Sequence, residues 1–155
     1  MSVYQGQWAF SLTPRIAIIA SHFNASISQA LVDGALFTLA RLGLPADVVD
    51  VIWVPGAFEI PGVARRVINR YDAVITLGAV IRGETPHFDY VAGAVATGVA
   101  DLARQGKKPV IFGVLTCNTV EEAEARAGGK HGNKGSDAAL AALEMISLYQ
   151  QLPDA

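Results

Sequence analysis

The segment from Gly78 to Tyr90 contains the residue types best suited to chemistry in this chain. A polar turn within it follows an apolar run and includes Gly83, which permits close backbone approach or an unusual φ angle. Thr85 is predicted to cap a helix that begins near Pro86, whose missing N–H costs nothing at the first helical position. His87 then lies in the first turn. Because free N–H groups at a helix start attract anions, we expect a phosphate to bind beside an imidazole.

Apolar runs alternate with segments of helical periodicity along the chain, which is typical of a parallel sheet with right-handed connections. The predicted fold is a flavodoxin-like three-layer α/β/α sandwich with a four-stranded parallel sheet. Residues 1–13 are predicted to form an extended arm or an edge strand. The predicted strands cover residues 15–20, 48–54, 73–77 and 110–115. The predicted helices cover residues 27–42, 57–70, 86–105 and 136–149, and a short helix opens at Thr119 and stops at Gly128.

Polar or aromatic residues follow every predicted strand at its carboxyl end, and in parallel sheets ligands bind beyond these ends. The clusters are His22 to Asn24, Pro55 to Pro61, Arg82 to His87, and Thr116 to Asn118. An ordinary strand-to-helix turn with a surface histidine would explain the third cluster alone. Unrelated turns need not all be polar or aromatic where the fold expects a ligand, so the sequence favours a binding site at this edge.

Several of these side chains have two interpretations. Phe23 either stacks on a flat heterocycle or packs onto the helix that follows it. Glu59 either accepts hydrogen bonds from hydroxyl or ring N–H groups or acts as a solvated helix cap. Arg126 and Lys134 are cations that could supplement a phosphate site, although each alone fits a surface position.

Composition argues against several classes of function. The net charge is −2 and no Lys/Arg run exceeds two residues, so we expect no nucleic-acid and no membrane partner. Cys117 is the only cysteine and no His/Cys cluster has zinc-ligand spacing, so neither a disulfide nor a metal site is expected. Cys117 is expected to be a small core or loop residue, and His22 and His131 are expected to have surface or hydrogen-bonded structural roles. Walker A and G-x-G-x-x-G patterns are absent, so no nucleotide cofactor is expected.

The length suits one domain, predicted to span residues 1–155. The start has no signal-peptide pattern and no apolar run approaches about 18 residues, so a cytoplasmic protein is expected. Charged residues make up only 17%, and the stretch Tyr90 to Ala100 carries no charge at all. A helix that is apolar on every side must be buried on every side. We therefore expect its outer face to line a subunit interface; the alternative is burial beneath helices of the same chain.

Several motifs together closely resemble the lumazine synthase family of riboflavin biosynthesis. The resemblance spans residues 15–149 in family order. Its motifs are Phe23-Asn24, Pro55-Gly56-Ala57-Phe58-Glu59-Ile60-Pro61, the segment from Gly78 to Val91, Phe112-Gly113-Val114-Leu115-Thr116, Arg126-Ala127-Gly128 and Gly132-Asn133-Lys134-Gly135. Pro86 departs from the threonine of many relatives, which removes one hydroxyl and one N–H near the expected phosphate.

The resemblance implies a transferase that needs neither cofactor nor metal. Its small-molecule substrates would be 5-amino-6-(D-ribitylamino)uracil and 3,4-dihydroxy-2-butanone 4-phosphate, which condense to 6,7-dimethyl-8-ribityllumazine with release of phosphate and water. His87 takes the position of the proton-transferring histidine. The implied pyrimidine and ribityl contacts are Phe23, Asn24, Ala57, Phe58, Glu59, Ala79, Val80, Ile81 and, from a neighbouring subunit, Phe112. The implied phosphate contacts are Gly83, Glu84, Thr85, Lys134 and, from the neighbour, Arg126.

The resemblance also implies a homopentamer in which the uncharged helix lines the pentamer axis. Independently of the resemblance, the arm of residues 1–13 is expected to contact a neighbouring subunit. Some members join further into decamers or into an icosahedral shell of twelve pentamers. The short linker at residues 132–135 lacks the insertion associated with pentamer-only members, so a shell is allowed. Two other interpretations are a non-catalytic lumazine or flavin carrier and a structural container. A carrier would be expected to lack His87 or Arg126, and both are present.

Overall fold

Four parallel strands form the central sheet of the computed structural model, which describes residues 1–152 and 154. The predicted end of the domain at residue 155 lies outside the described residues. The sheet order is β2-β1-β3-β4, which places β2 and β4 at the edges. In chain order the strands are β1 (Ile16–Ser21), β2 (Val49–Val54), β3 (Ala73–Ile81) and β4 (Val110–Cys117).

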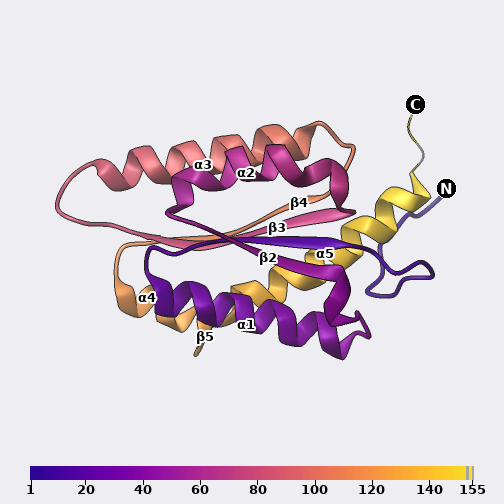
Figure 1. Cartoon of the computed structure of the whole chain (residues 1–155), viewed down its shortest axis with the longest axis horizontal. Coiled ribbons are helices and arrows are strands. Elements are labelled where there is room, and N and C mark those ends of the chain that lie inside the picture. The colour runs from indigo at the N-terminus through magenta and orange to yellow at the C-terminus, as the bar shows by residue number, and fades with distance from the viewer. Residues whose placement is uncertain (153, 155) are drawn as a thin grey trace.

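Helices cover both faces of this sheet, which confirms the predicted flavodoxin-like three-layer sandwich (Figure 1). On one face lie α1 (Ala25–Arg41), α4 (Val120–Ala125) and α5 (Lys134–Gln151), and on the other lie α2 (Ile60–Val67) and α3 (His87–Arg104). Single 3₁₀ turns occupy Ala46–Val48, Ala57–Glu59 and Ile68–Arg70. A small antiparallel ribbon, β5 (Ala127–Gly129) and β6 (Gly132–Asn133), precedes α5.

Alternate residues along each strand enter two separate cores, because successive side chains point to opposite faces of a sheet. Both faces are apolar, as burial beneath two helical layers requires. The first core includes Ile18, Ile75, Leu31 of α1 and Leu143 of α5, and the second includes Ile19, Val74, Ile60 of α2 and Val95 of α3.

The third strand is longer than predicted. It continues past Leu77 to Ile81, so Ala79, Val80 and Ile81 belong to β3 and not to the loop. The physical reason is that β4 also runs on to Cys117, and the two strands stay paired up to Ile81 opposite Cys117. The apolar edge of the candidate site is therefore strand and only its polar part is loop.

The last helix begins two residues earlier than predicted. Asn133 is its N-cap: its side-chain Oδ1 accepts hydrogen bonds from the backbone N–H groups of Gly135 and Ser136, at 2.8 and 3.2 Å. An asparagine at this position satisfies two N–H groups that the first helical turn leaves free, so Lys134 already belongs to α5. The predicted short linker of residues 132–135 is instead the strand β6 followed by the start of α5.

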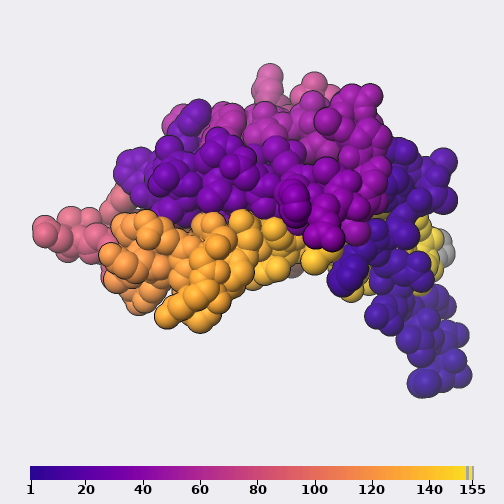
Figure 2. Space-filling view, turned by 90° about the horizontal axis from the view of Figure 1, so that it is seen from below, coloured from indigo at the N-terminus to yellow at the C-terminus, as the bar shows by residue number. Residues whose placement is uncertain are grey.

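Residues 1–13 form an arm and pair with no strand of the described chain. Of the two predicted forms, the extended arm is present and the edge strand is not formed in the single chain. Figure 2 shows part of the arm reaching away from the body of the molecule. Tyr4 and Trp8 of the arm are exposed. The arm is tied to the last helix at residue 5, where Nε2 of Gln151 in α5 donates to the Gln5 carbonyl oxygen at 2.8 Å.

The uncharged part of α3 is covered by its own chain on one side only. Val95 and Val99 are buried against the sheet, whereas Gly93 and Thr97 are exposed and Tyr90 keeps 75% of its surface accessible. The alternative of burial beneath helices of the same chain is therefore wrong. An apolar helix face is left open for another molecule to cover.

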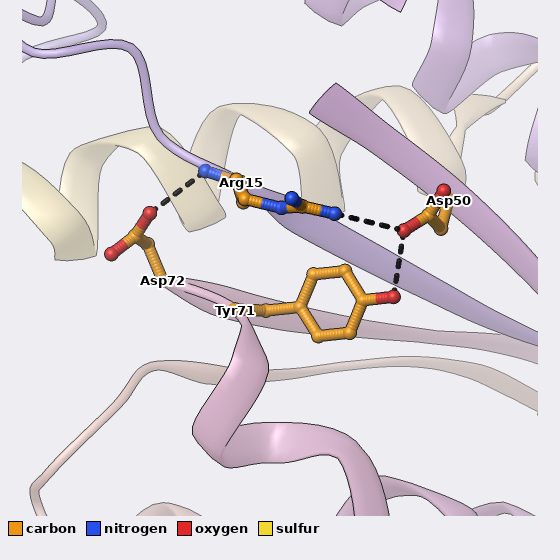
Figure 3. Close-up of polar contacts among 4 residues, drawn as sticks. All are labelled: Arg15, Asp50, Tyr71 and Asp72. Carbon is orange, nitrogen blue, oxygen red and sulfur yellow. Dashed lines mark hydrogen bonds and ion pairs between the residues drawn. The ribbon is translucent and has the colours of Figure 1, made fainter. Parts of the chain in front are cut away.

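A polar cluster joins the amino ends of the strands, at the end of the sheet opposite the candidate site (Figure 3). Asp50 of β2 accepts a hydrogen bond from the Tyr71 hydroxyl at 2.7 Å and pairs with the Arg15 guanidinium at 3.5 Å. Asp72 accepts a hydrogen bond from the backbone N–H of Arg15 at 2.8 Å, and Lys108 donates to the Tyr71 carbonyl oxygen at 2.9 Å. These bonds connect the chain at the start of all four strands.

We expect this cluster to make stability fall in alkaline solution. Burial, together with the Asp50 carboxylate, raises the pKa of Tyr71 above its ordinary value of 10.0. The folded state therefore holds the phenolic proton more tightly than the unfolded state, and the stabilisation present below pH 10 is lost as pH rises through the raised pKa. Tyr71→Phe should remove this alkaline fall in stability and should lower the free energy of unfolding by about 1 kcal/mol at pH 7.

The measurement is urea unfolding of the wild type and Tyr71→Phe between pH 7 and pH 11. The difference in the free energy of unfolding between the two proteins should shrink above pH 10. Tyr4→Phe, which changes an exposed tyrosine of the arm, is the control. A difference that stays constant across this range would contradict the expected role of the Tyr71 hydroxyl.

Candidate active site

A cavity of about 590 Å³ lies at the carboxyl ends of β1, β2 and β3, against the start of α3. It brings together eleven of the residues predicted for the site. They are Phe23, Asn24, Ala57, Phe58, Glu59, Ala79, Val80, Ile81, Gly83, Thr85 and His87. The convergence of strand ends expected from a parallel sheet thus places the aromatic ring, the carboxylate, the polar turn and the imidazole around one space.

The end of β1 presents Phe23 to this cavity. The backbone N–H of His22 donates to the Val54 carbonyl oxygen at 2.8 Å, and that of Phe23 donates to the Pro55 carbonyl oxygen at 3.1 Å. These bonds extend the pairing with β2 into the loop. Phe23 keeps 73% of its surface exposed, so its ring does not pack onto α1, and the interpretation that it staples the following helix is wrong. An exposed ring at a cavity wall is available for stacking on a planar ligand.

Asn24 anchors the same loop to the centre of the sheet. Its backbone is left-handed, with φ 61° and ψ 52°, a conformation that asparagine adopts more readily than most residues. Its side-chain Nδ2 donates to the Ala79 carbonyl oxygen at 3.0 Å. The position of Phe23 relative to β3 is therefore set by the residue that follows it.

Glu59 combines its two predicted interpretations. One carboxylate oxygen, Oε2, accepts a hydrogen bond from the backbone N–H of Gly56 at 3.0 Å and so closes the 3₁₀ turn that leads into α2. The same side chain also lines the cavity. A carboxylate held in this way can accept a hydrogen bond from a ligand hydroxyl or ring N–H without moving.

The polar turn ends at His87, the first residue of α3. The helix begins one residue later than predicted, with Pro86 as its N-cap, and the Thr85 hydroxyl accepts a hydrogen bond from the His87 N–H at 3.4 Å. Glu84 lies in the same turn and is exposed. The turn and the imidazole share one cavity, so an anion at the helix start would lie within reach of His87.

The predicted cations lie elsewhere in the chain. A second cavity, of about 630 Å³, follows the edge strand β4 next to α4 and the start of α5, and it contains Phe112, Arg126 and Lys134. The Arg126 Nη1 donates to the Glu122 carbonyl oxygen at 2.9 Å. Within one chain, the structure thus separates these three residues from the cavity that contains His87.

Cys117 also lines the second cavity, but its surroundings do not suit a nucleophile. Burial raises the pKa of its thiol, with Glu122 acting in the same direction and Arg126 in the opposite one. A raised pKa keeps the thiol protonated, and the thiolate is the reactive form. The expected role as a small buried residue is therefore retained.

Residues that the sequence interpretation did not assign to the site also line the two cavities. In the first they are Gly56, Phe88, Tyr90 and Val91, and in the second they include Thr116, Glu122, His131 and Asp137. Tyr90 and Val91 could have been found from helical spacing, because residues three and four positions after His87 lie on its face. His22 is outside both cavities and stacks on Trp53, with ring centroids 4.9 Å apart.

No helix in residues 1–152 combines the length and apolar character needed to cross a lipid bilayer. Nor do three or more His, Cys, Asp or Glu side chains gather closely enough to hold a metal ion in this part of the chain.

Comparison with known proteins gives a consistent result. Residues 13–150 match the family described as 6,7-dimethyl-8-ribityllumazine synthase. A protein of that name from Gemmatimonas aurantiaca is 52% identical over 139 residues, which cover 88% of this chain and 85% of the relative. Proteins of the same name from two strains of Thermus thermophilus are 54% identical over 140 residues, which cover 89% of each chain. The chain therefore belongs to the 6,7-dimethyl-8-ribityllumazine synthase family.

Proposed function

We propose that this protein condenses 5-amino-6-(D-ribitylamino)uracil with 3,4-dihydroxy-2-butanone 4-phosphate to give 6,7-dimethyl-8-ribityllumazine, phosphate and water, the penultimate step of riboflavin biosynthesis. One observation carries the proposal beyond family membership: the exposed Phe23 ring, the Glu59 carboxylate, the polar turn and His87 line the same cavity. The proposed compartment is the cytoplasm, which suits a chain whose only cysteine, Cys117, is a free thiol.

The cavity offers a place for each part of the reaction. The pyrimidine stacks on Phe23, its polar edge meets Glu59 and the backbone at the end of β3, and the phosphate binds at residues 83–85. The substrate amine attacks the ketone and expels one water to form an imine, phosphate leaves, and the ring closes with loss of a second water. These steps require proton transfers and an anion site, and a histidine can both give and accept protons near neutral pH. Holding the two substrates together supplies much of the rate.

We further propose that the complete site forms between two subunits of a homopentamer. Among the described residues, no lysine or arginine lines the first cavity, yet a phosphate dianion in a protein site needs cationic partners. Arg126 and Lys134 line the second cavity instead. If the second cavity of one subunit faces the first cavity of its neighbour, Phe112 closes the pocket and Arg126 reaches the phosphate. The open face of α3 and the arm of residues 1–13 supply contact surface for this assembly, and pentamers can then join into a larger shell.

The test is to mix the purified protein with both substrates in the absence of metal, nucleotide and flavin. We expect the lumazine product, detected by its fluorescence, and free phosphate to form at the same rate and in equimolar amounts. Sedimentation velocity on the same preparation reports the assembly. Product formation no faster than the uncatalysed background would exclude the proposed reaction.

Removal of the imidazole should slow this reaction without altering the assembly. We expect His87→Ala to lower kcat by about tenfold to a hundredfold, at or below the lower end of typical acid–base contributions, because water can take part of the role of an exposed imidazole. His87→Gln keeps a hydrogen-bonding side chain of similar size but cannot shuttle protons, so it should be equally slow. Recovery of wild-type kcat in His87→Gln would show that His87 only orients the substrate.

A further inference from the structure

Arg82 lies outside the wall of the first cavity but contacts two segments on either side of its polar turn. Its backbone N–H donates to the Cys117 carbonyl oxygen at 2.9 Å, at the end of β4. Its Nε donates to the Asn118 Oδ1 at 3.0 Å, and its Nη2 pairs with the Asp89 Oδ1 at 3.3 Å. The guanidinium carbon also lies 4.3 Å from the centroid of the Phe88 ring. One side chain therefore joins the end of the sheet to the first turn of α3.

Asn118, the residue that Arg82 contacts at the end of the sheet, is itself held in place. The backbone N–H of Asn118 donates to the Glu122 Oε2 at 2.8 Å, and the Thr119 hydroxyl accepts from the Glu122 N–H at 3.1 Å. These two bonds form the N-terminal cap of α4, so Asn118 belongs to a defined helix start and not to a loose loop.

The residues that Arg82 contacts on the helix side lie next to His87, the proposed proton-transferring residue. Phe88 and Asp89 directly follow His87 in the first turn of α3, and Phe88 lines the cavity beside it. The four residues between Arg82 and His87 form the turn and belong to no strand or helix. The first turn of α3 is otherwise held by the turn backbone and by apolar packing of Phe88 and Val91 on the core beneath. Apolar packing is not directional, so without the polar contacts of Arg82 the imidazole of His87 could shift relative to a bound phosphate.

We propose that Arg82 is a positioning residue, which holds the anion-binding turn and His87 in the geometry that the butanone phosphate requires. This inference rests on the proposed function of the same site. Arg82 is not assigned to phosphate binding itself, because it does not line the cavity and its charge is paired with Asp89. A single exposed ion pair contributes little to stability. A planar guanidinium that contacts Asn118, Asp89 and the Phe88 ring at once can order the turn, whereas the ammonium group of a lysine cannot make all three contacts.

The experiment compares Arg82→Ala, Arg82→Lys and Asn118→Ala with the wild type in steady-state assays that vary each substrate separately. We expect each variant to raise KM for the butanone phosphate by about tenfold and to lower kcat by a similar factor, while KM for the pyrimidine stays within about twofold. Lysine retains the charge but cannot reach Asn118, Asp89 and the Phe88 ring together, so Arg82→Lys should not restore activity. The matched control is Arg41→Ala, which removes an exposed arginine stacked on Phe37, 5.7 Å from its ring centroid, on the outer surface of α1.

Hydrogen–deuterium exchange without substrates tests the same inference independently of the reaction. We expect faster amide exchange in residues 83–89 of the Arg82 and Asn118 variants and no change there in Arg41→Ala. If the wild type is inactive, the proposed function is refuted. The hydrogen–deuterium exchange result then still decides whether Arg82 orders residues 83–89. Unchanged exchange, full activity in Arg82→Lys, or an equal rise in both KM values would each overturn the inference. If Arg82→Ala does not fold, Asn118→Ala provides the same test from the other end of the contact.

Discussion

Replacing Arg126 by alanine is expected to lower kcat/KM for the butanone phosphate by between about 10² and 10³-fold. Arg126 lines the second cavity, and one of its amino groups already donates to the Glu122 carbonyl oxygen, which orients the guanidinium. The other N–H groups can bind a phosphate dianion through two parallel hydrogen bonds. Truncating one partner of such a charged pair costs about 3–4 kcal/mol, which corresponds to this loss in kcat/KM.

The effect should be selective for one substrate. The dissociation constant of the pyrimidine, measured by titration in the absence of the phosphate substrate, should change by less than about twofold, since the pyrimidine is assigned to the other part of the pocket. Lys130→Ala is the matched control, because it removes an exposed cation near Arg126 that does not line the second cavity. Equal loss of affinity for both substrates in Arg126→Ala would contradict the role assigned to this residue.

Mixing variants tests whether Arg126 acts on the cavity of a neighbouring subunit. His87→Ala and Arg126→Ala chains are each expected to be slow as pure assemblies. When the two chains are unfolded, mixed and reassembled, some pockets receive His87 from one subunit and Arg126 from the next, so activity should exceed that of either variant. A mixture no more active than the average of its components would place both residues in pockets formed by single chains.

Gly135→Ala is expected to destabilise the fold by about 3 kcal/mol or more. A methyl group at this position would lie 1.9 Å from the Leu31 carbonyl oxygen and 2.7 Å from its carbon, and a backbone cannot move aside as a side chain can. The close approach is held by Asn133, whose Nδ2 donates to the Ala30 carbonyl oxygen at 3.0 Å, and by Ser136, whose hydroxyl donates to that of Gly34 at 3.0 Å. Overpacking of this kind forces α1 and α5 apart along their buried faces.

Urea unfolding at one fixed protein concentration measures this change, since assembly contributes to apparent stability. Gly62→Ala is the control, because Gly62 lies in α2 with no atom within 4 Å of the added methyl position. That substitution should raise the free energy of unfolding by up to about 1 kcal/mol, because alanine favours a helix. A Gly135→Ala protein that unfolds at the wild-type urea concentration would show that the two helices separate at little cost.

Local sequence patterns were sufficient to predict which segments form strands or helices and which residues form much of the site. Apolar runs such as Ala73 to Leu77 and the helical spacing of the segments between them predict a parallel sheet covered on both faces. Once the sheet is parallel, the clusters around Phe23, Glu59 and His87 must meet at one edge, and they line one cavity. Glycine and proline residues also predicted most helix and strand ends to within one or two residues of their observed positions. These residues end an element through their own backbone conformation, which is a local property.

Features that depend on contacts between distant segments were decided only by the tertiary structure. The length of β3 follows from its pairing with β4, and Ile81 and Cys117 are far apart in the chain. The contact of Arg82 with Asn118 is equally remote in sequence, and no local pattern predicts it. The open face of α3 and the separation of Arg126 from His87 emerge only when the chain has folded, because burial depends on what the remaining elements cover and leave uncovered.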